Sequence, residues 1–496
     1  MICVSIGRGR HRHVIAEHKH LVEQGATLVE LRLDYINGAV NLKRVLPARP
    51  SPVVITLRRP QDGGKWSGAE DQRRMILRAA IADGVEYVDL EEDAAAQIPR
   101  YGKTKRIISY HNFQKTPDDL ESIHARLAKL DADIVKLATM ANHPQDNVRM
   151  LELVRASKVP MVGLCMGDIG TPSRILAGRF GAAFSYATFH HERALAPGQL
   201  SFDQMTKIYH YDQIGPETEV FGVIGDPIAH SLSPLVHNAA MRGDKLDRVY
   251  IPFRVPRDDV PNFLASAPRL GVRGLSVTIP HKEAAFAAAT DRDKDSEAIQ
   301  AANTLVFDAR RIRAYNTDCR AAMDSLAEAL GEVGPDSHRV ALQSALVMGA
   351  GGAAKAIAHG LVARGVRSVV ISSRTAARAE ALAKPLGCKT VAWEERHGVP
   401  ADVIVNCTPI GMHPNVDESP YDAKQLKPTM LIFDTVYNPE NTLFVKQGRE
   451  AGCAVITGAE MFIRQAAMQY QLFHDREPPT GVMKETLRRA IGAAKY

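Results

Sequence analysis

The amino-acid sequence predicts an α/β protein in two parts, a (β/α)8 barrel at the N-terminus followed by a second α/β region. Three observations predict this architecture. The chain has 496 residues, which is too long for one ordinary domain. Residues 1–210 alternate apolar runs with amphipathic stretches, and the glycine-rich segment 349–354 stands between a strand-like run and a helix-like one.

The barrel prediction rests on apolar runs of the kind that parallel strands buried on both faces require. They occupy residues 2–6, 27–34, 52–58, 87–91, 106–111, 133–139, 160–166 and 183–188, with amphipathic stretches such as 68–82, 118–130 and 145–157 between them. Eight strand–helix units are expected. Barrel active sites lie at the C-terminal ends of the strands. The candidate site residues near those ends are Glu30, Arg32, Asp34, Arg58, Glu91, His111, Lys136 and Met166.

The composition is that of a globular protein, with 45% hydrophobic and 24% charged residues and a net charge of +6. Lysine and arginine form no long runs, so no nucleic-acid partner is expected. The basic excess suits anionic small molecules but is equally compatible with a plain basic surface. No apolar run is long enough to predict a membrane span, so no membrane association is expected.

Six scattered cysteines without a CxxC pair, and no signal-like N-terminal pattern, predict a cytoplasmic protein. Four histidines (His11, His13, His18 and His20) suggest a metal site, but their polar helix-like segment favours a solvated face, so no metal is expected. The sequence leaves the oligomeric state open between monomer and homodimer.

Lys136 stands in the middle of the apolar strand DIVKLAT, where an unpaired charge is costly. Burial and nearby cations favour the neutral amine that attacks a carbonyl to form a Schiff base. An ion pair with Glu30 or Glu91 is an equally good interpretation of this lysine taken alone.

His111 ends the preceding strand in SYHNF, so the barrel brings it towards Lys136. An imidazole suits general acid–base catalysis. A polar histidine satisfied within the core is the alternative, and the neighbouring lysine favours catalysis.

The segments VELRLD, TLRRPQDGG, SYHNF, IVKLAT, CMGDIGTPSR and APGQ resemble, in order, the type I 3-dehydroquinate dehydratases. The resemblance implies that Lys136 forms an imine with a substrate ketone and that His111 moves protons. It implies that Arg174 binds the substrate carboxylate. Asp62 stands where that family usually has the Glu that orients the His, and Leu195 where a small or hydroxyl residue is common. The other substrate-binding residues implied are Glu30, Arg32, Arg58 and Gln199.

In the second region, Gly349, Gly351 and Ala354 fit the G-x-G-x-x-A pattern of a dinucleotide-binding turn. The next strand ends in Ser372, Ser373, Arg374 and Thr375, with Arg378 nearby. Hydroxyls and guanidinium groups there suit the 2′-phosphate of NADP, whereas NAD is selected by an acidic residue. Exposed polar residues at a strand end are the alternative.

Lys282 in VTIPHK and Asp318 in NTD form a candidate acid–base pair for alcohol and ketone oxidoreduction, with a structural salt bridge as the alternative. These segments, with SLSPLVHN, AANT, NCTPIGM, DTVYNP and GAEMFIRQA, resemble shikimate dehydrogenase over residues 219–480. The resemblance implies a substrate site of Ser231, Ser233, Thr278, Asn303, Tyr437 and Gln465. It implies an NADP site of Gly349, Ala350, Gly351, Gly352, Ala353, Ser373, Arg374, Thr375, Arg378, Thr408, Met412 and Gly458.

Taken together, the chain resembles the bifunctional 3-dehydroquinate dehydratase/shikimate dehydrogenase family, in which the product of the lyase is the substrate of the NADP-dependent oxidoreductase. We expect a barrel over residues 1–212, a linker over 212–219, a substrate domain over 219–322, a helix-then-loop segment over 323–340, and a Rossmann domain over 340–458. A C-terminal helix over 459–490 should return to the substrate domain. The alternatives are an aldolase-like barrel fused to a quinate dehydrogenase, and one half acting only as a scaffold.

Overall fold

The computed structural model describes residues 1–47, 49–308, 311–333 and 341–493. Its contacts divide the chain into two compact units. The first unit comprises residues 1–222, 226–234 and 247–272, and the second comprises residues 223–225, 235–246 and 273–496. The first unit therefore extends beyond the predicted barrel.

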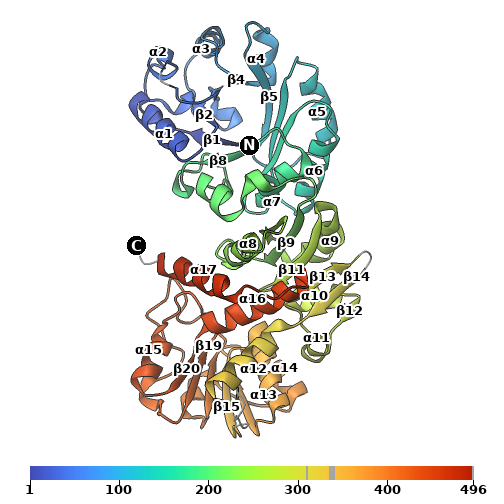
Figure 1. Ribbon diagram of the computed structural model, residues 1–496, viewed down its shortest axis with the longest axis vertical. Coiled ribbons are helices and arrows are strands. Elements are labelled where there is room, and N and C mark those ends of the chain that lie inside the picture. Colours follow the sequence, from blue (N-terminus) through green and yellow to red (C-terminus); the bar gives the residue numbers. More distant parts are fainter. Residues whose placement is uncertain (48, 309–310, 334–340, 494–496) are drawn as a thin grey trace. The chain divides into compact units, whose positions relative to one another are not determined.

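Eight parallel strands form the nearly closed barrel of the first unit, which confirms the predicted fold class (Figure 1). The order of neighbours is β7-β6-β5-β4-β3-β2-β1-β8, and a backbone bond from Ala183 N to Met161 O (2.9 Å) links the segment before β8 to β7. The strands are β1 (Ile2–Ile6), β2 (Leu28–Arg32), β3 (Val53–Thr56), β4 (Tyr87–Glu91), β5 (Lys105–Asn112), β6 (Ile134–Met140), β7 (Met161–Met166) and β8 (Ser185–Thr188).

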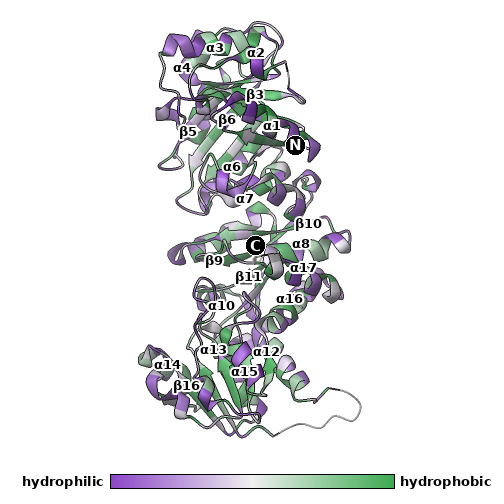
Figure 2. Ribbon diagram, turned by 90° about the vertical axis from the view of Figure 1, so that its left-hand side faces the viewer, coloured by the Kyte–Doolittle hydropathy of each residue, from purple (hydrophilic) through white to green (hydrophobic). Residues whose placement is uncertain are grey.

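Helices cover the outside of the barrel, and its strands are largely hydrophobic (Figure 2). The prediction of eight full strand–helix units is wrong for the last unit, where residues Gln204–Ile208 form one wide π-helical turn closed by the bond from Tyr209 N to Gln204 O. The helices are α1 (His11–Glu23), α2 (Leu42–Val45), α3 (Glu70–Ala82), α4 (Glu92–Gln97), α5 (Leu120–Ala128), α6 (Gln145–Ala156) and α7 (Thr171–Leu176).

Helix α1 carries the four histidines of the N-terminal segment. Three of them are solvated to different degrees, but His18 is buried, with Nε2 2.8 Å from Ser51 Oγ. His18 therefore does not belong to the predicted solvated face, because the His18 side chain is buried on the same side of the helix as Leu21 and Val14.

The predicted linker is packed rather than free within the first unit. Arg179 donates hydrogen bonds to the carbonyl oxygens of Pro216 (2.6 Å) and Thr218. Thr218 is buried, and its hydroxyl donates to Asp247 Oδ1 (2.6 Å). Residues 212–219 are thus held at several points.

After the linker come β9 (Glu219–Gly225), α8 (Ser233–Gly243), β10 (Arg248–Arg254) and α9 (Val260–Ser266). The chain continues with β11 (Val272–Val277), α10 (Lys282–Ala288), β12 (Asp291–Arg292), α11 (Lys294–Ile299), β13 (Thr304–Asp308), β14 (Arg311–Tyr315) and α12 (Thr317–Ala329). Strand β13 pairs antiparallel with both β11 and β14. The predicted loop at the end of 323–340 falls partly outside the described residues, because 334–340 are not among them.

A six-stranded parallel sheet in the order β17-β16-β15-β18-β19-β20 follows. Its order reverses beside β15, the arrangement of a Rossmann fold, which places a ligand crevice at the C-terminal end of that strand. The strands are β15 (Ser344–Met348), β16 (Ser368–Ser372), β17 (Lys389–Val391), β18 (Val403–Asn406), β19 (Leu431–Asp434) and β20 (Ala454–Ile456). The helices are α13 (Gly352–Arg364), α14 (Ala376–Leu386) and α15 (Leu443–Glu450).

Two helices, α16 (Gly458–His474) and α17 (Thr480–Ala493), stand where one helix was expected over 459–490. Asp475 takes a left-handed conformation (φ 49°), and Pro478 and Pro479 follow, so the helical hydrogen bonds cannot continue. Gln469 of α16 accepts a hydrogen bond from Ser276 Oγ (2.7 Å) and donates one to Thr304 Oγ1 (3.0 Å). These buried bonds hold α16 against β11 and β13.

Candidate active sites

One pocket of the barrel gathers most of the residues predicted for the lyase. Strands β2, β5, β6 and β7 supply them, along with the segment after β3, helix α7 and the segment after β8. Its lining includes Glu30, Arg32, Arg58, Asp62, His111, Lys136, Met166, Arg174, Leu195 and Gln199. Residues distant in sequence therefore converge on a single site, as their positions at the strand ends predict.

Lys136 is buried at 5% exposure and is fully partnered. Its Nζ donates to Asp89 Oδ2 (2.8 Å) and Tyr186 Oη (3.1 Å), and Glu30 Oε1 lies 3.8 Å away. The ion pair that the sequence allowed with Glu30 exists, but the closest carboxylate is that of Asp89 and not of Glu91. Of these three partners, Glu30 and Tyr186 also line the pocket, whereas Asp89 does not.

Asp89 is the residue that sequence reasoning missed. Its Oδ1 accepts from Ser109 Oγ (2.6 Å) and lies 2.8 Å from Arg58 Nη2, while Oδ2 faces Lys136. Burial opposes ionisation, but the charges of Arg58 and Lys136 outweigh it and lower the pKa of Asp89 far below its usual range. Asp89 is therefore a carboxylate bridging two cations. The sequence offered one signal for Asp89: it stands two residues before Glu91 in β4, so the two side chains lie on the same face of the strand.

His111 lies on β5, the strand next to β6, with its Nδ1 2.8 Å from Arg58 Nη1. Its ring stacks on Phe113 at a centroid distance of 6.3 Å. Burial and the positive charges of Arg58 and Lys136 lower the pKa of His111 well below its ordinary value. The imidazole is consequently neutral at neutral pH, which is the charge state that general-base catalysis requires.

Arg174, on α7, is a buried cation without a carboxylate partner among the described residues. Its Nη2 donates to Pro197 O (3.2 Å), and its Nε has no hydrogen-bond partner. Burial lowers the pKa of Arg174 to about 10. A buried guanidinium in this state is costly unless an anion completes it, so the site is built for an anionic ligand.

The remaining lyase residues are held by the fold. Glu30 accepts from Ser5 Oγ (2.6 Å) and Thr56 Oγ1 (2.8 Å), and Arg32 makes a bidentate pair with Asp34 (2.9 and 2.8 Å). Gln199 accepts from Leu195 N (2.9 Å).

Asp62 does not take the place of a His-orienting Glu. It accepts from Arg59 Nε (2.8 Å), whereas the group on His111 is Arg58. The shorter carboxylate therefore joins the neighbouring arginine.

In the second unit, Lys282 at the start of α10 donates through Nζ to Asp318 Oδ2 at 2.5 Å. Asp318 Oδ1 accepts from Asn303 Nδ2 (2.9 Å), which also donates to Thr317 Oγ1 (2.9 Å). The two residues predicted as an acid–base pair are thus in contact, and an amide fixes the orientation of the carboxylate.

The other predicted substrate residues of this unit occupy short ordered segments. Thr278 N donates to Ile224 O (3.0 Å), Gln465 Nε2 donates to Phe462 O (2.9 Å), and the ring of Tyr437 lies 4.7 Å from that of Phe462. Ser231 and Ser233 belong to the first unit, where Ser233 N donates to Ser231 Oγ (3.3 Å).

The glycine-rich turn after β15 leaves room for a dinucleotide. Gly349 has φ 116°, a conformation that favours glycine, and a Cβ there would lie 2.8 Å from Cys407 O. No atom lies within 4 Å of a Cβ built on Gly351, so this side of the turn is open. Helix α13 begins at Gly352, and its free amide groups with Ala353 suit a pyrophosphate.

The residues predicted for the adenosine phosphate follow β16, where Arg374, Thr375 and Arg378 are exposed. Thr375 N donates to Ser373 Oγ (3.3 Å). No acidic side chain stands in this segment, so the residues present fit a 2′-phosphate.

On the far side of the crevice, Thr408 Oγ1 donates to Asn406 Oδ1 (2.6 Å), and Met412 is 45% exposed. A Cβ on Gly458 would lie 2.3 Å from Val436 O, so only glycine fits there.

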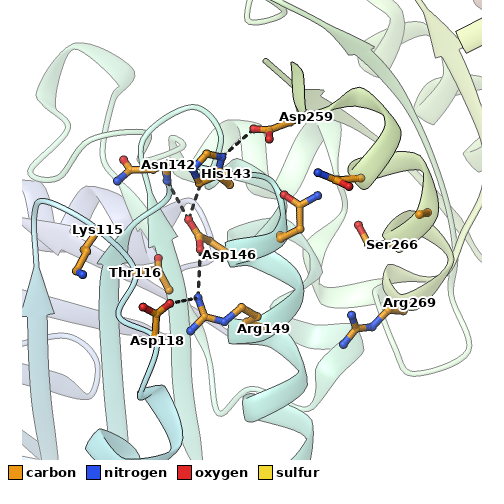
Figure 3. Close-up of a pocket in the computed structure, with 13 residues that line it drawn as sticks. Lys115, Thr116, Asp118, Asn142, His143, Asp146, Arg149, Asp259, Ser266 and Arg269 are labelled. Atoms are coloured by element: carbon orange, nitrogen blue, oxygen red, sulfur yellow. Dashed lines mark hydrogen bonds and ion pairs between the residues drawn. The ribbon is translucent and has the colours of Figure 1, made fainter. Parts of the chain in front are cut away.

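A second cavity in the first unit, of about 770 Å³, lies apart from the predicted chemistry (Figure 3). Residues 115–118, 142–149 and 259–269 contribute to its lining, and several of its charged groups pair with each other. His143 Nδ1 is 3.0 Å from Asp259 Oδ2, and Asp146 accepts from the backbone of Asn142 (3.0 Å). None of the predicted catalytic residues lines it.

Family models match the chain in four places. Type I 3-dehydroquinase matches residues 2–216, the shikimate dehydrogenase substrate binding domain 223–305, and the shikimate 5′-dehydrogenase C-terminal domain 458–488. A model of F420-dependent NADP oxidoreductases matches residues 344–436. The matches cover both predicted regions.

Known proteins are similar over the whole chain and over its second part. The Arabidopsis thaliana bifunctional 3-dehydroquinate dehydratase/shikimate dehydrogenase, a chloroplastic protein, is 36% identical over 95% of this chain and 82% of its own length. The Methanopyrus kandleri shikimate dehydrogenase (NADP+) is 38% identical over 55% of this chain and 96% of its own. A solved shikimate dehydrogenase in complex with NADP+ has a TM-score of 0.51 and 35% identity, covering 56% of this chain and 96% of its own. Among the described residues, no helix has the length and apolar character needed to cross a membrane.

Proposed function

This chain belongs to the bifunctional 3-dehydroquinate dehydratase/shikimate dehydrogenase family, and we propose which of its residues carry each of the two reactions. The enzyme dehydrates 3-dehydroquinate to 3-dehydroshikimate and reduces that product to shikimate with NADPH. The observation that carries the lyase assignment is the buried pocket in which Lys136, His111 and the uncompensated Arg174 converge.

At the lyase site, Arg174 pairs with the substrate carboxylate and places the ketone near Lys136. The amine of Lys136 attacks the ketone carbon, and loss of water leaves an imine. His111 takes the proton from the adjacent carbon, and the electrons move towards the imine nitrogen as the hydroxyl group departs as water. Hydrolysis of the imine then releases 3-dehydroshikimate and restores Lys136.

At the dehydrogenase site, Lys282 and Asp318 bind the reacting oxygen and hold its proton, with Asn303 keeping the carboxylate in place. Ser231 and Ser233 bind the substrate carboxylate, while Thr278, Tyr437 and Gln465 complete the substrate site. NADPH supplies the hydride when it is bound along the turn at residues 349–353. Arg374 and Arg378 hold its 2′-phosphate, with Ser373 and Thr375, and Thr408, Met412 and Gly458 border the nicotinamide.

A coupled assay tests both assignments at once. Full-length enzyme mixed with 3-dehydroquinate and NADPH should consume NADPH, because the oxidoreductase receives its substrate only from the lyase. Replacement of Lys136 by Ala should abolish this signal, and added 3-dehydroshikimate should restore it. Persistent signal in the Lys136 variant would rule out the lyase assignment.

We also propose a cellular compartment and an oligomeric state for this protein. All six cysteines are free thiols, which suits a reducing compartment such as the cytoplasm. We expect a monomer or a homodimer that acts on small molecules.

A further inference from the structure

A buried chain of charged groups joins the lysine and the histidine of the lyase site. Asp89 contacts Lys136 through Oδ2 and Arg58 through Oδ1, both at 2.8 Å. Arg58 then reaches His111 Nδ1, also at 2.8 Å. The nucleophile and the base are therefore connected through one carboxylate and one guanidinium.

The contact between Arg58 and His111 determines where the imidazole carries its proton. A guanidinium group has only donors and stays charged. Burial opposes that charge, but Asp89 and Glu91 outweigh burial and raise the pKa of Arg58 above its ordinary value. Nδ1 of His111 must consequently accept, and a neutral ring that accepts at Nδ1 carries its proton on Nε2.

The charges around the ring favour the same state. The cations Arg58, Lys136 and Arg32 face it together with one carboxylate, Asp89, and Phe113 lies against it. Burial and the cations disfavour a second proton. No described residue hydrogen-bonds Nε2, so this nitrogen remains for the substrate.

We propose that Arg58 is a positioning residue that keeps His111 in its Nε2–H tautomer. The ring becomes a base only when bound substrate attracts Arg58 and breaks its contact with Nδ1. This inference rests on the proposed role of His111 as the base. When Arg58 leaves, Nε2 gives its proton to solvent while Nδ1 takes one, so the ring stays neutral. The Nε2 lone pair can then accept the substrate proton.

The tautomer can be measured by NMR on the full-length chain with ¹³C,¹⁵N-labelled histidine, using His111→Gln to identify the His111 signals. The wild type should show neutral Nε2–H His111 at neutral pH and still at the pH where an ordinary histidine is half protonated. In Arg58→Met the pKa of His111 should rise, because a neighbouring cation that lowers it is lost. Arg59→Met is the matched control, since Arg59 pairs with Asp62 and Asp93 and should leave the His111 signals unchanged.

Release of Arg58 is tested on enzyme trapped with borohydride and 3-dehydroquinate. His111 should leave the Nε2–H state once the adduct fills the pocket. An Nδ1–H ring in the free wild type, an unchanged pKa of His111 in Arg58→Met, or an unchanged tautomer in the adduct would each overturn the proposal. If Arg58→Met does not fold, Arg58→Lys serves instead: it keeps a cation but not the planar fork, and should weaken the Nδ1 contact. Trapping tests the proposed function separately, because the adduct forms on Lys136 whatever tautomer His111 holds.

Discussion

Oδ2 of Asp89 lies 2.8 Å from Nζ of Lys136, although the two residues stand on β4 and β6, which are separated by β5. The same carboxylate meets Arg58. Asp89 thus neutralises two buried cations, and the lysine of the resting enzyme is held in a fixed position.

Replacement of Asp89 by Asn should cost about 3–5 kcal/mol of stability at neutral pH, because two buried cations lose their partner. The pKa of Asp89 is lowered in the folded state, so its stabilisation is present above its ordinary pKa of 3.8 and is lost as the pH falls below it. The difference in unfolding free energy between the wild type and Asp89→Asn should therefore become smaller at acidic pH. Urea unfolding at neutral and acidic pH measures this difference. Asp93 forms an exposed ion pair with Arg59, so the control Asp93→Asn should lower the unfolding free energy by less than about 1 kcal/mol. Equal losses of stability in Asp89→Asn and Asp93→Asn would contradict the bridging role of Asp89.

Borohydride should trap an adduct of 3-dehydroquinate on Lys136. The residue is the lysine of the pocket that holds His111 and Arg174. Mass spectrometry of the digested protein should find the modification there and on no other lysine. An unmodified Lys136 after complete inactivation would exclude the imine.

The two reactions should be chemically separable, because each site carries its own acid–base pair. Lys136→Ala should abolish dehydration and leave the oxidation of shikimate by NADP within a few-fold. Asp318→Asn should do the reverse, since a carboxamide cannot take a proton. Steady-state rates of both half-reactions on both variants provide the comparison. Loss of both activities in a folded Lys136→Ala protein would indicate a shared or coupled site.

Arg374→Ala should raise the KM for NADPH by roughly ten- to several-hundred-fold, because charge-assisted hydrogen bonds contribute about 1.5–3 kcal/mol each. The KM for NADH should change little, since that cofactor has no 2′-phosphate. Initial rates with the two cofactors give the ratio. An equal increase in KM for NADPH and for NADH would show that Arg374 does not bind the 2′-phosphate.

Gly352→Ala should impair the dehydrogenase and spare the lyase. A Cβ at this position would lie 2.7 Å from Cδ of Lys282, so the side chain that contacts Asp318 must shift from its present position. We expect kcat to fall by roughly tenfold or more, given how strongly catalysis depends on placement. Gly398→Ala is the control, because a Cβ there meets no atom within 4 Å. A Gly352→Ala enzyme as active as this control would show that Lys282 tolerates the shift.

The strands could be predicted to within a few residues because parallel strands leave uninterrupted apolar runs, as in VVIT of β3 and MVGLCM of β7. The lyase site could be predicted in outline because its polar residues stand near strand ends. The role of Asp89 could not be predicted, because the segment YVDLE has the pattern of a buried strand in which only the last residue, Glu91, stands at the functional end. Its role depends on pairing across β5, which a single strand does not encode.

Two other differences have local causes. The resemblance placed Asp62 where the family usually has the Glu that orients the His, but Arg59 is three residues away and pairs with the carboxylate. The break between α16 and α17 follows from Asp475, Pro478 and Pro479, whose effect a continuous apolar pattern conceals.

The contacts of the first unit bear on how this chain can be divided. Arg269 pairs with Glu152 on α6, His143 with Asp259, and Thr218 with Asp247, all within the one compact unit. A gene cut at the polar segment 212–219 would separate the two chemistries but would leave these groups without partners. Residue 272 is no cleaner a boundary, because residues 223–225 and 235–246 belong to the second unit while residues 226–234 and 247–272 belong to the first, so no single cut in the chain separates the two units. The boundary between the two reactions and the boundary between the two compact units do not coincide.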